Sequence, residues 1–193
     1  MNYQIIQRPF TLAFRDMSKK ELKEYNEWFH KIIPERIQIL TSAIKTTPGY
    51  ENWEPDCSPE SLEPLGEWFL SHVEMRPRTQ EEIEEIQSRS RSKFPIYTSG
   101  NELTNKTISL AMDIGMYVSQ VFLKNHPELQ WSQPFGSKNF VDYGRPVLIS
   151  FTSAPFNPVR MMVTLAYCFS DKSKLGDRLR ELYNIWSAMI KST

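Results

Sequence analysis

Residues 104–126 read TNKTISLAMDIGMYVSQVFLKNH, and this stretch is the most apolar part of the chain. Its few polar side chains fall in one narrow stripe, made of Ser109, Asp113, Gln120 and Lys124. A helix that is apolar on almost every side normally lies at the centre of a core. Ala111, Gly115 and Ser119 stand four residues apart, which gives a smooth ridge for close packing. We therefore predict a central helix over residues 104–125.

Helical patterns precede this segment. Apolar residues at helical spacing predict helices over residues 18–46, 58–73 and 80–92. Capping boxes mark two of the starts, Ser18 with Glu21 and Thr79 with Glu82. Pro34 either kinks the first helix or begins a second one, and both alternatives stay open.

Short β patterns follow the central segment. The predicted strands are residues 129–131, 140–143 and 146–151, separated by proline and glycine turns. They predict a small antiparallel sheet of about three short strands within residues 129–152, packed by the central helix. Residues 159–169 fit a helix or a strand, and the preceding Asn157-Pro158 favours a helix.

The two ends of the chain complete the predicted fold. Residues 3–6 suggest one more short strand, and residues 173–191 predict a last helix. Helices, a small sheet and then helices again are typical of α+β proteins. A chain of 193 residues suits one domain, so we expect a mainly helical α+β domain over residues 1–193.

Composition excludes several classes of protein. The 23 basic and 23 acidic residues give a net charge of zero, which argues against nucleic-acid binding. The N-terminal residues lack the apolar stretch of a signal peptide, and the longest apolar run is too short to span a membrane. Cys57 and Cys168 are too few and too far apart for a secreted disulfide framework. We expect a cytoplasmic protein that does not bind a membrane.

The chain also lacks recognisable motifs for catalysis or metal binding. His30, His72 and His126 do not form a metal-binding spacing, and no glycine-rich phosphate loop or nucleophile elbow occurs. We therefore expect no catalytic residues, no metal site and no cofactor. The sequence does not determine the oligomeric state.

The charge is unevenly distributed along the chain. Residues 46–75 contain seven acidic residues and no lysine or arginine, a local charge of −7. The predicted partner-binding residues within the acidic face of residues 51–67 are Glu51, Trp53, Glu54, Asp56 and Glu60. Carboxylates steer a basic partner and exposed aromatic rings anchor it. In the competing interpretation, Trp68 and Phe69 are core residues and the carboxylates only solvate the surface.

Asp113 supports a second hypothesis, because an ionised side chain in an apolar helix needs a partner. The partner that we expect is an arginine, either Arg145 or Arg160. A pocket between helix 104–125 and the sheet would then be lined by Asp113, Trp131, Tyr143 and Arg160. The competing interpretation places Asp113 on a narrow solvent-exposed edge of the helix.

Residues 104–165 also contain the sequences DIGMY (113–117), LQW (129–131), PVLISF (146–151) and FNPVR (156–160). This segment resembles a segment of uncharacterised cytosolic bacterial proteins, some of which are similar to immunity proteins that neutralise toxins. The resemblance implies a packing unit and a protein partner, and it assigns no functional residue.

Two functions are therefore compared. The first is a non-enzymatic protein-binding factor, immunity-like or regulatory, that uses the acidic face to bind a protein with a basic surface. The alternative is an enzyme or small-ligand binder whose pocket lies between helix 104–125 and the sheet.

Overall fold

A computed structural model describes residues 3–89, 99–170 and 177–191. These residues form a mainly helical α+β fold, as the sequence predicts. The helices are α1 (Lys19–Lys45), α2 (Leu62–His72), α3 (Gln80–Arg89), α4 (Asn105–Asn125), α5 (Pro158–Ser170) and α6 (Arg178–Ser187). The strands are β1 (Met75–Pro77), β2 (Asn101–Leu103), β3 (Gln130–Ser132) and β4 (Val147–Ile149).

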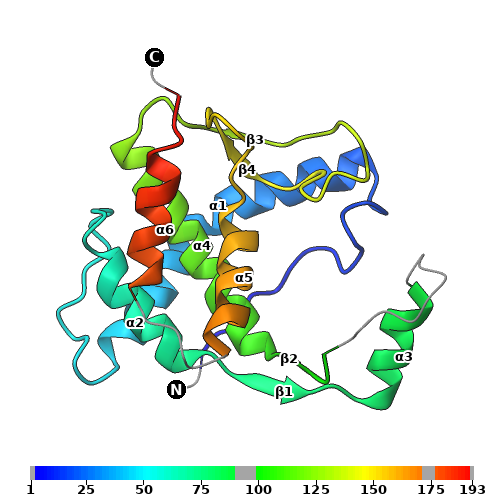
Figure 1. Ribbon diagram of the computed structural model, residues 1–193, viewed down its shortest axis with the longest axis horizontal. Helices are drawn as coiled ribbons and strands as arrows, with labels where there is room; N and C mark the ends of the chain where they lie inside the picture. Colours follow the sequence, from blue (N-terminus) through cyan, green and yellow to red (C-terminus); the bar gives the residue numbers. More distant parts are fainter. Residues whose placement is uncertain (1–2, 90–98, 171–176, 192–193) are drawn as a thin grey trace.

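The predicted central helix is confirmed as α4, which packs mainly against α5 and α1 (Figure 1). Residues 109–119 of α4 are all buried, so the helix is covered around its whole circumference. Gly115 allows α5 to approach closely. A Cβ atom added there would lie 2.8 Å from the Cα atom of Val159 and 3.0 Å from the carbonyl carbon of Pro158. Gly115, the middle residue of the small-residue ridge, therefore packs against the first turn of α5.

α1 begins with the predicted capping box, in which the Glu21 amide donates to Ser18 Oγ and the Ser18 amide donates to the Glu21 carboxylate. The helix continues through Pro34, so this residue does not begin a second helix. α1 buries one stripe of side chains against the core, made of Leu22, Tyr25, Phe29, Ile33, Arg36, Leu40, Ala43 and Ile44.

α2 and α6 pack against each other and cover a further side of the core. Trp68 and Phe69 of α2 are fully buried, which confirms that they are core residues. α2 begins at Leu62, later than the predicted start at Ser58. The amides of Leu62 and Glu63 donate to carbonyls three residues earlier, so a turn precedes the α-helical hydrogen bonds.

The β region differs from the predicted three-stranded sheet. β3 pairs antiparallel with β4, with Trp131 opposite Leu148. The predicted strand at residues 140–143 is wrong, because the chain turns there: the Tyr143 amide donates to the Phe140 carbonyl at 3.0 Å. These turns bring Asp142 into the interior, where it is 1% exposed. The second sheet pairs β1 antiparallel with β2, and it was not predicted from the sequence.

Other predictions concern the ends of the chain. The helix predicted over residues 159–169 is confirmed as α5, and Asn157 Oδ1 accepts from the Arg160 amide at its start. The strand predicted at residues 3–6 is wrong, because side chains of α1 and α4 bind this backbone instead of a strand partner. The last helix ends at Ser187, since Ile190 pairs with Phe151. Residues 90–92 and 173–176 of two predicted helices lie outside the described residues.

β1, β2 and α3 extend from the helical body (Figure 1). Arg76 forms ion pairs with Glu82 and Glu102. At the start of α3, the backbone amide of Glu82 donates to the Thr79 hydroxyl, and the backbone amide of Thr79 donates to the Glu82 carboxylate. The predicted capping box at Thr79 is therefore confirmed. Polar interactions hold this extension together.

We expect Gly115→Leu to lower the free energy of unfolding by about 3 kcal/mol, because the new side chain would collide with the backbone of α5. Thermal unfolding measures the effect as a fall in Tm on the order of 6–12 °C. Gly136→Leu is the matched control, since a Cβ atom at Gly136 meets nothing within 4 Å. Equal Tm values for the two variants would contradict the close contact between α4 and α5.

Candidate functional site

Asp113 lies at the centre of a buried polar cluster that joins three parts of the chain. Arg36 of α1 donates from Nε to Oδ1 at 2.8 Å and from Nη2 to Oδ2 at 2.7 Å. The Tyr3 hydroxyl also donates to Oδ2. A second bond from Arg36 Nη2 reaches the carbonyl of Gln4 at 2.8 Å. The cluster therefore fastens the N-terminal segment to α1 and α4.

The charges in this cluster compensate one another. Burial raises the pKa of Asp113, and the hydrogen bonds from Arg36 and Tyr3 oppose that rise. Burial would lower the pKa of Arg36, but the bonds and charge of Asp113 outweigh it and raise the pKa. Burial, followed by the nearby carboxylate, raises the pKa of Tyr3. Both carboxylate oxygens of Asp113 accept hydrogen bonds, which fits an ionised Asp113 paired with a charged Arg36.

Sequence reasoning named the wrong partners and the wrong environment for Asp113. Arg145 and Arg160 do not bind it, and the predicted solvent-exposed edge is wrong, because Asp113 is 0% exposed. Arg36 was missed because it lies 77 residues earlier in the chain, on another helix. Its position between Ile33 and Leu40 on the buried stripe of α1 was the one signal available in the sequence.

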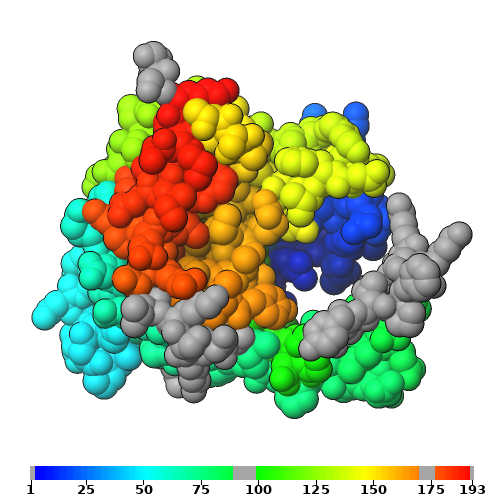
Figure 2. All heavy atoms as spheres, viewed as in Figure 1, coloured from blue at the N-terminus to red at the C-terminus, as the bar shows by residue number. Residues whose placement is uncertain are grey.

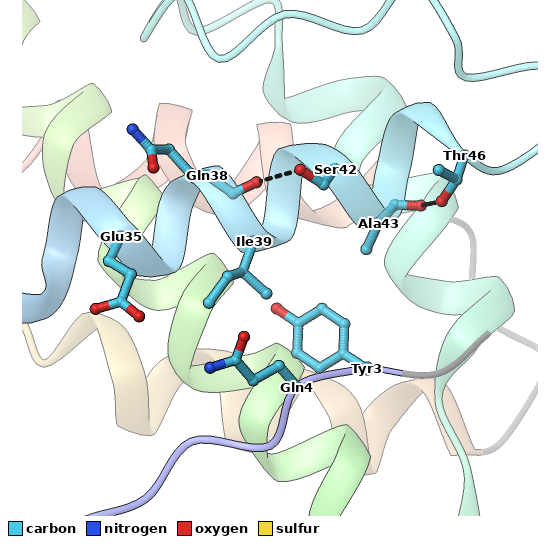
Figure 3. A pocket seen from close by; sticks show the side chains of 8 residues that line it. All are labelled: Tyr3, Gln4, Glu35, Gln38, Ile39, Ser42, Ala43 and Thr46. Atoms are coloured by element: carbon cyan, nitrogen blue, oxygen red, sulfur yellow. Dashed lines mark hydrogen bonds between the residues drawn. The ribbon is translucent and has the colours of Figure 1, made fainter.

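A groove of about 510 Å³ lies beside this cluster, along the outer side of α1 (Figure 3). The Tyr3 ring lies near Ile39, between the N-terminal segment and α1, while Glu35 and Thr46 lie toward opposite ends. The hydroxyls of Ser42 and Thr46 donate to carbonyls of their own helix. Glu35 is exposed and has no ion pair within the described part of the chain. The groove thus combines an apolar side with one unpaired carboxylate.

The acidic face follows directly after α1. Its carboxylates, all exposed, belong to Glu51, Glu54, Asp56, Glu60, Glu63 and Glu67. Glu54 pairs with Lys45, and Glu60 pairs with Arg180 at 2.9 Å. Hydrogen bonds from Ser58 lower the pKa of Asp56, and backbone hydrogen bonds lower that of Glu51. Glu51 and Asp56 therefore keep their negative charge at neutral pH.

Trp53 does not belong to this exposed face. Its side chain is 6% exposed, and its Nε1 donates to the carbonyl of Ser61 at 3.1 Å. Its ring lies 5.4 Å from that of Tyr117, centroid to centroid. The aromatic side chain expected to anchor a partner is therefore part of the core, whereas Glu51, Glu54, Asp56 and Glu60 are on the surface.

The residues of the alternative pocket do not meet in one site. Asp113 binds Arg36, whereas Arg160 binds Asp142 through Nε and Nη2, both at 2.8 Å. The Trp131 ring packs at 5.1 Å from the ring of His30, centroid to centroid. Tyr143 lines a different pocket, near the N-terminal segment. These separate contacts give no support to a shared site between α4 and the sheet.

Two further properties concern the described residues. They contain no group of three or more histidine, cysteine, aspartate or glutamate side chains placed to hold a metal ion. Within the same ranges, no helix has both the length and the apolarity that a bilayer crossing requires.

In comparisons with known proteins, the chain matches no family model, no curated protein and no solved structure.

We expect Asp113→Ala to lower the free energy of unfolding by about 3–5 kcal/mol, because it leaves the Arg36 guanidinium buried without its counter-ion. Denaturant unfolding at neutral pH measures the loss. Asp16→Ala is the control, because Asp16 is an exposed carboxylate and should change stability by less than about 0.5 kcal/mol. A loss of similar size in both variants would show that the buried pair contributes nothing specific.

Proposed function

We propose that this chain is a non-enzymatic, cytoplasmic protein-binding factor, immunity-like or regulatory, whose acidic face binds a protein with a basic surface. The observation that carries the proposal is the set of exposed carboxylates between residues 51 and 67. Glu51, Glu63 and Glu67 have no ion pair with any residue that the structure describes, so their charge is available to a partner. Complementary charge speeds encounter and selects partners.

The positions of these carboxylates favour a partner surface over a small ion. The first of them lie in the loop after α1, and Glu63 and Glu67 are four residues apart on α2, on one face of that helix. Figure 2 shows the loop and α2, in cyan to turquoise, forming one side of the molecule. Lys45 and Arg180 tether Glu54 and Glu60, which limits the motion of part of the face.

The groove beside α1 supplies the apolar contact that Trp53 does not. It ends at Thr46, in the loop after α1, and the acidic face begins five residues later, at Glu51. The half-buried Ile39 offers apolar surface there, and Glu35 adds a carboxylate farther along the groove. A basic segment lying along the groove would meet carboxylates at both ends. This arrangement, with apolar contact between charged groups, is common at protein interfaces.

A charge-reversal pair tests the proposal. We expect Glu63→Lys/Glu67→Lys to abolish or weaken about ten-fold the binding of a basic partner, because two attractive charges become repulsive. The tagged protein is used to capture partners from its native lysate at low and at high salt, and affinity is then measured with the purified partner. High salt should release it, since exposed charge attraction is screened.

Glu81→Lys/Glu84→Lys on α3 is the matched control, because it changes net charge by the same amount on another exposed helix. It should bind the partner as the wild type does. A partner retained equally by both double variants, or a wild-type protein that captures no basic partner at low salt, would overturn the proposal.

A further inference from the structure

A second charged site lies beyond the other end of α1. A pocket of about 350 Å³ forms between the N-terminal segment and the loop that joins β3 to β4. Figure 2 shows these segments, in blue and yellow-green, next to each other. The pocket is lined by the cations Arg15, Lys138 and Arg145 and by the aromatic rings of Phe14, Phe140 and Tyr143. Its residues thus combine positive charge with aromatic surface.

Arg145 is the most buried of the three cations in the pocket lining. Its guanidinium has neither a hydrogen bond nor an ion pair with any residue in the described ranges, and it lies 4.3 Å from the centroid of the Phe14 ring. Burial lowers the pKa of Arg145. Interactions with Tyr25 and then Asp142 oppose this fall, whereas the positive charges of Arg160 and Arg8 add to it. A partly buried cation without a counter-ion is strained electrostatically, and an anion in the pocket would relieve that strain.

The nearby carboxylate of Asp142 does not serve as that anion. The Asp142 carboxylate accepts one hydrogen bond from Arg160 Nε and one from Arg160 Nη2. The side-chain amide of Asn157 also donates to it, at 2.7 Å. Its charge is therefore paired inside the protein. Asp16, which follows the pocket residue Arg15 in the sequence, is exposed and forms no ion pair within the described residues. The pocket lining keeps an excess of positive charge.

Both walls of the pocket are held in place. Gln133 Nε2 donates to the carbonyl of Leu22 at 2.6 Å and to that of Gly144 at 2.8 Å, which ties the loop to α1. Gly144 has a φ of +68°, and a Cβ there would collide with the Leu22 side chain. Lys138 Nζ donates to the carbonyl of Arg15 at 3.0 Å, which joins the two walls. A preformed site loses less entropy when a ligand binds.

We propose that this pocket binds a small phosphate monoester that carries an aromatic group. The phosphate of such a ligand carries a charge of about −1.5 to −2, which suits a lining with three cations. A guanidinium matches phosphate geometry better than an ammonium does, and Arg145 and Arg15 supply two. Phe140 is 39% exposed and offers surface for the aromatic group, whereas the rings of Phe14 and Tyr143 are already packed against other side chains of the protein. The volume lies within the range of about 300–1,000 Å³ that is usual for ligand pockets.

Isothermal titration of the full chain with phenyl phosphate tests this site. We expect Arg145→Gln to weaken binding about ten-fold and Arg15→Gln or Lys138→Gln about three-fold each, because charge-assisted bonds are lost. Arg15 and Lys138 are exposed, so these two variants keep the fold. Lys31→Gln, which removes an exposed lysine of α1 outside the pocket lining, is the control and should bind as the wild type does.

Two further probes separate the parts of the ligand. Inorganic phosphate should bind several-fold more weakly than phenyl phosphate, and phenol should not bind measurably. The proposal is overturned if phenyl phosphate does not bind up to about 10 mM, or binds a folded Arg145→Gln variant as tightly as the wild type. Equal affinity for inorganic phosphate and phenyl phosphate would overturn the aromatic part of the proposal.

Discussion

The ion pair between Asp113 and Arg36 is the interaction on which the rest of the structure depends. Asp113 lies in the most apolar helix of the chain, and the pair links α4 to α1 at a place where Asp113 is fully buried and the Arg36 side chain is 5% exposed. Removing charges from water is costly, so such a pair persists where both partners are held in place and fully hydrogen-bonded. The Tyr3 hydroxyl donates a further hydrogen bond to Asp113, and the Gln4 carbonyl accepts one from Arg36. These two bonds hold the N-terminal segment against the two helices. The groove beside α1 is built on this segment, and the basic pocket uses its continuation at residues 13–15.

The two charged sites lie beyond opposite ends of α1. The pocket's N-terminal residues precede this helix and the acidic face follows it, and a helix of 27 residues is about 40 Å long. The net charge of zero therefore conceals an uneven distribution. In the interior, Asp113 and Asp142 are each neutralised by an arginine, so the uncompensated charge is found near the surface. This separation favours functions that use surface recognition.

The sequence predicted the parts of the fold that local patterns determine. Capping boxes at Ser18 and Thr79, the apolar α4 and the asparagine before α5 each depend on a few neighbouring residues, and the structure confirms them. Predictions failed where distant residues decide the outcome. The turns at residues 140–143 place Asp142 against Arg160, and the partner of Asp113 lies on another helix. Trp53 was assigned to the surface because its acidic neighbours are exposed, although its own ring packs against Tyr117. The basic pocket joins residues more than 120 positions apart, which no local pattern reveals.

Hydrogen–deuterium exchange in a Tyr3→Phe variant tests most directly whether the buried cluster holds the N-terminal segment. This change removes one bond to Asp113 and leaves the pair with Arg36 intact. The amide of Ile6, which donates to Ser109 Oγ at 2.9 Å, should exchange about ten-fold faster than in the wild type. Amides in the middle of α5 should change much less. Unchanged exchange at Ile6, or an equal increase throughout the molecule, would contradict the account.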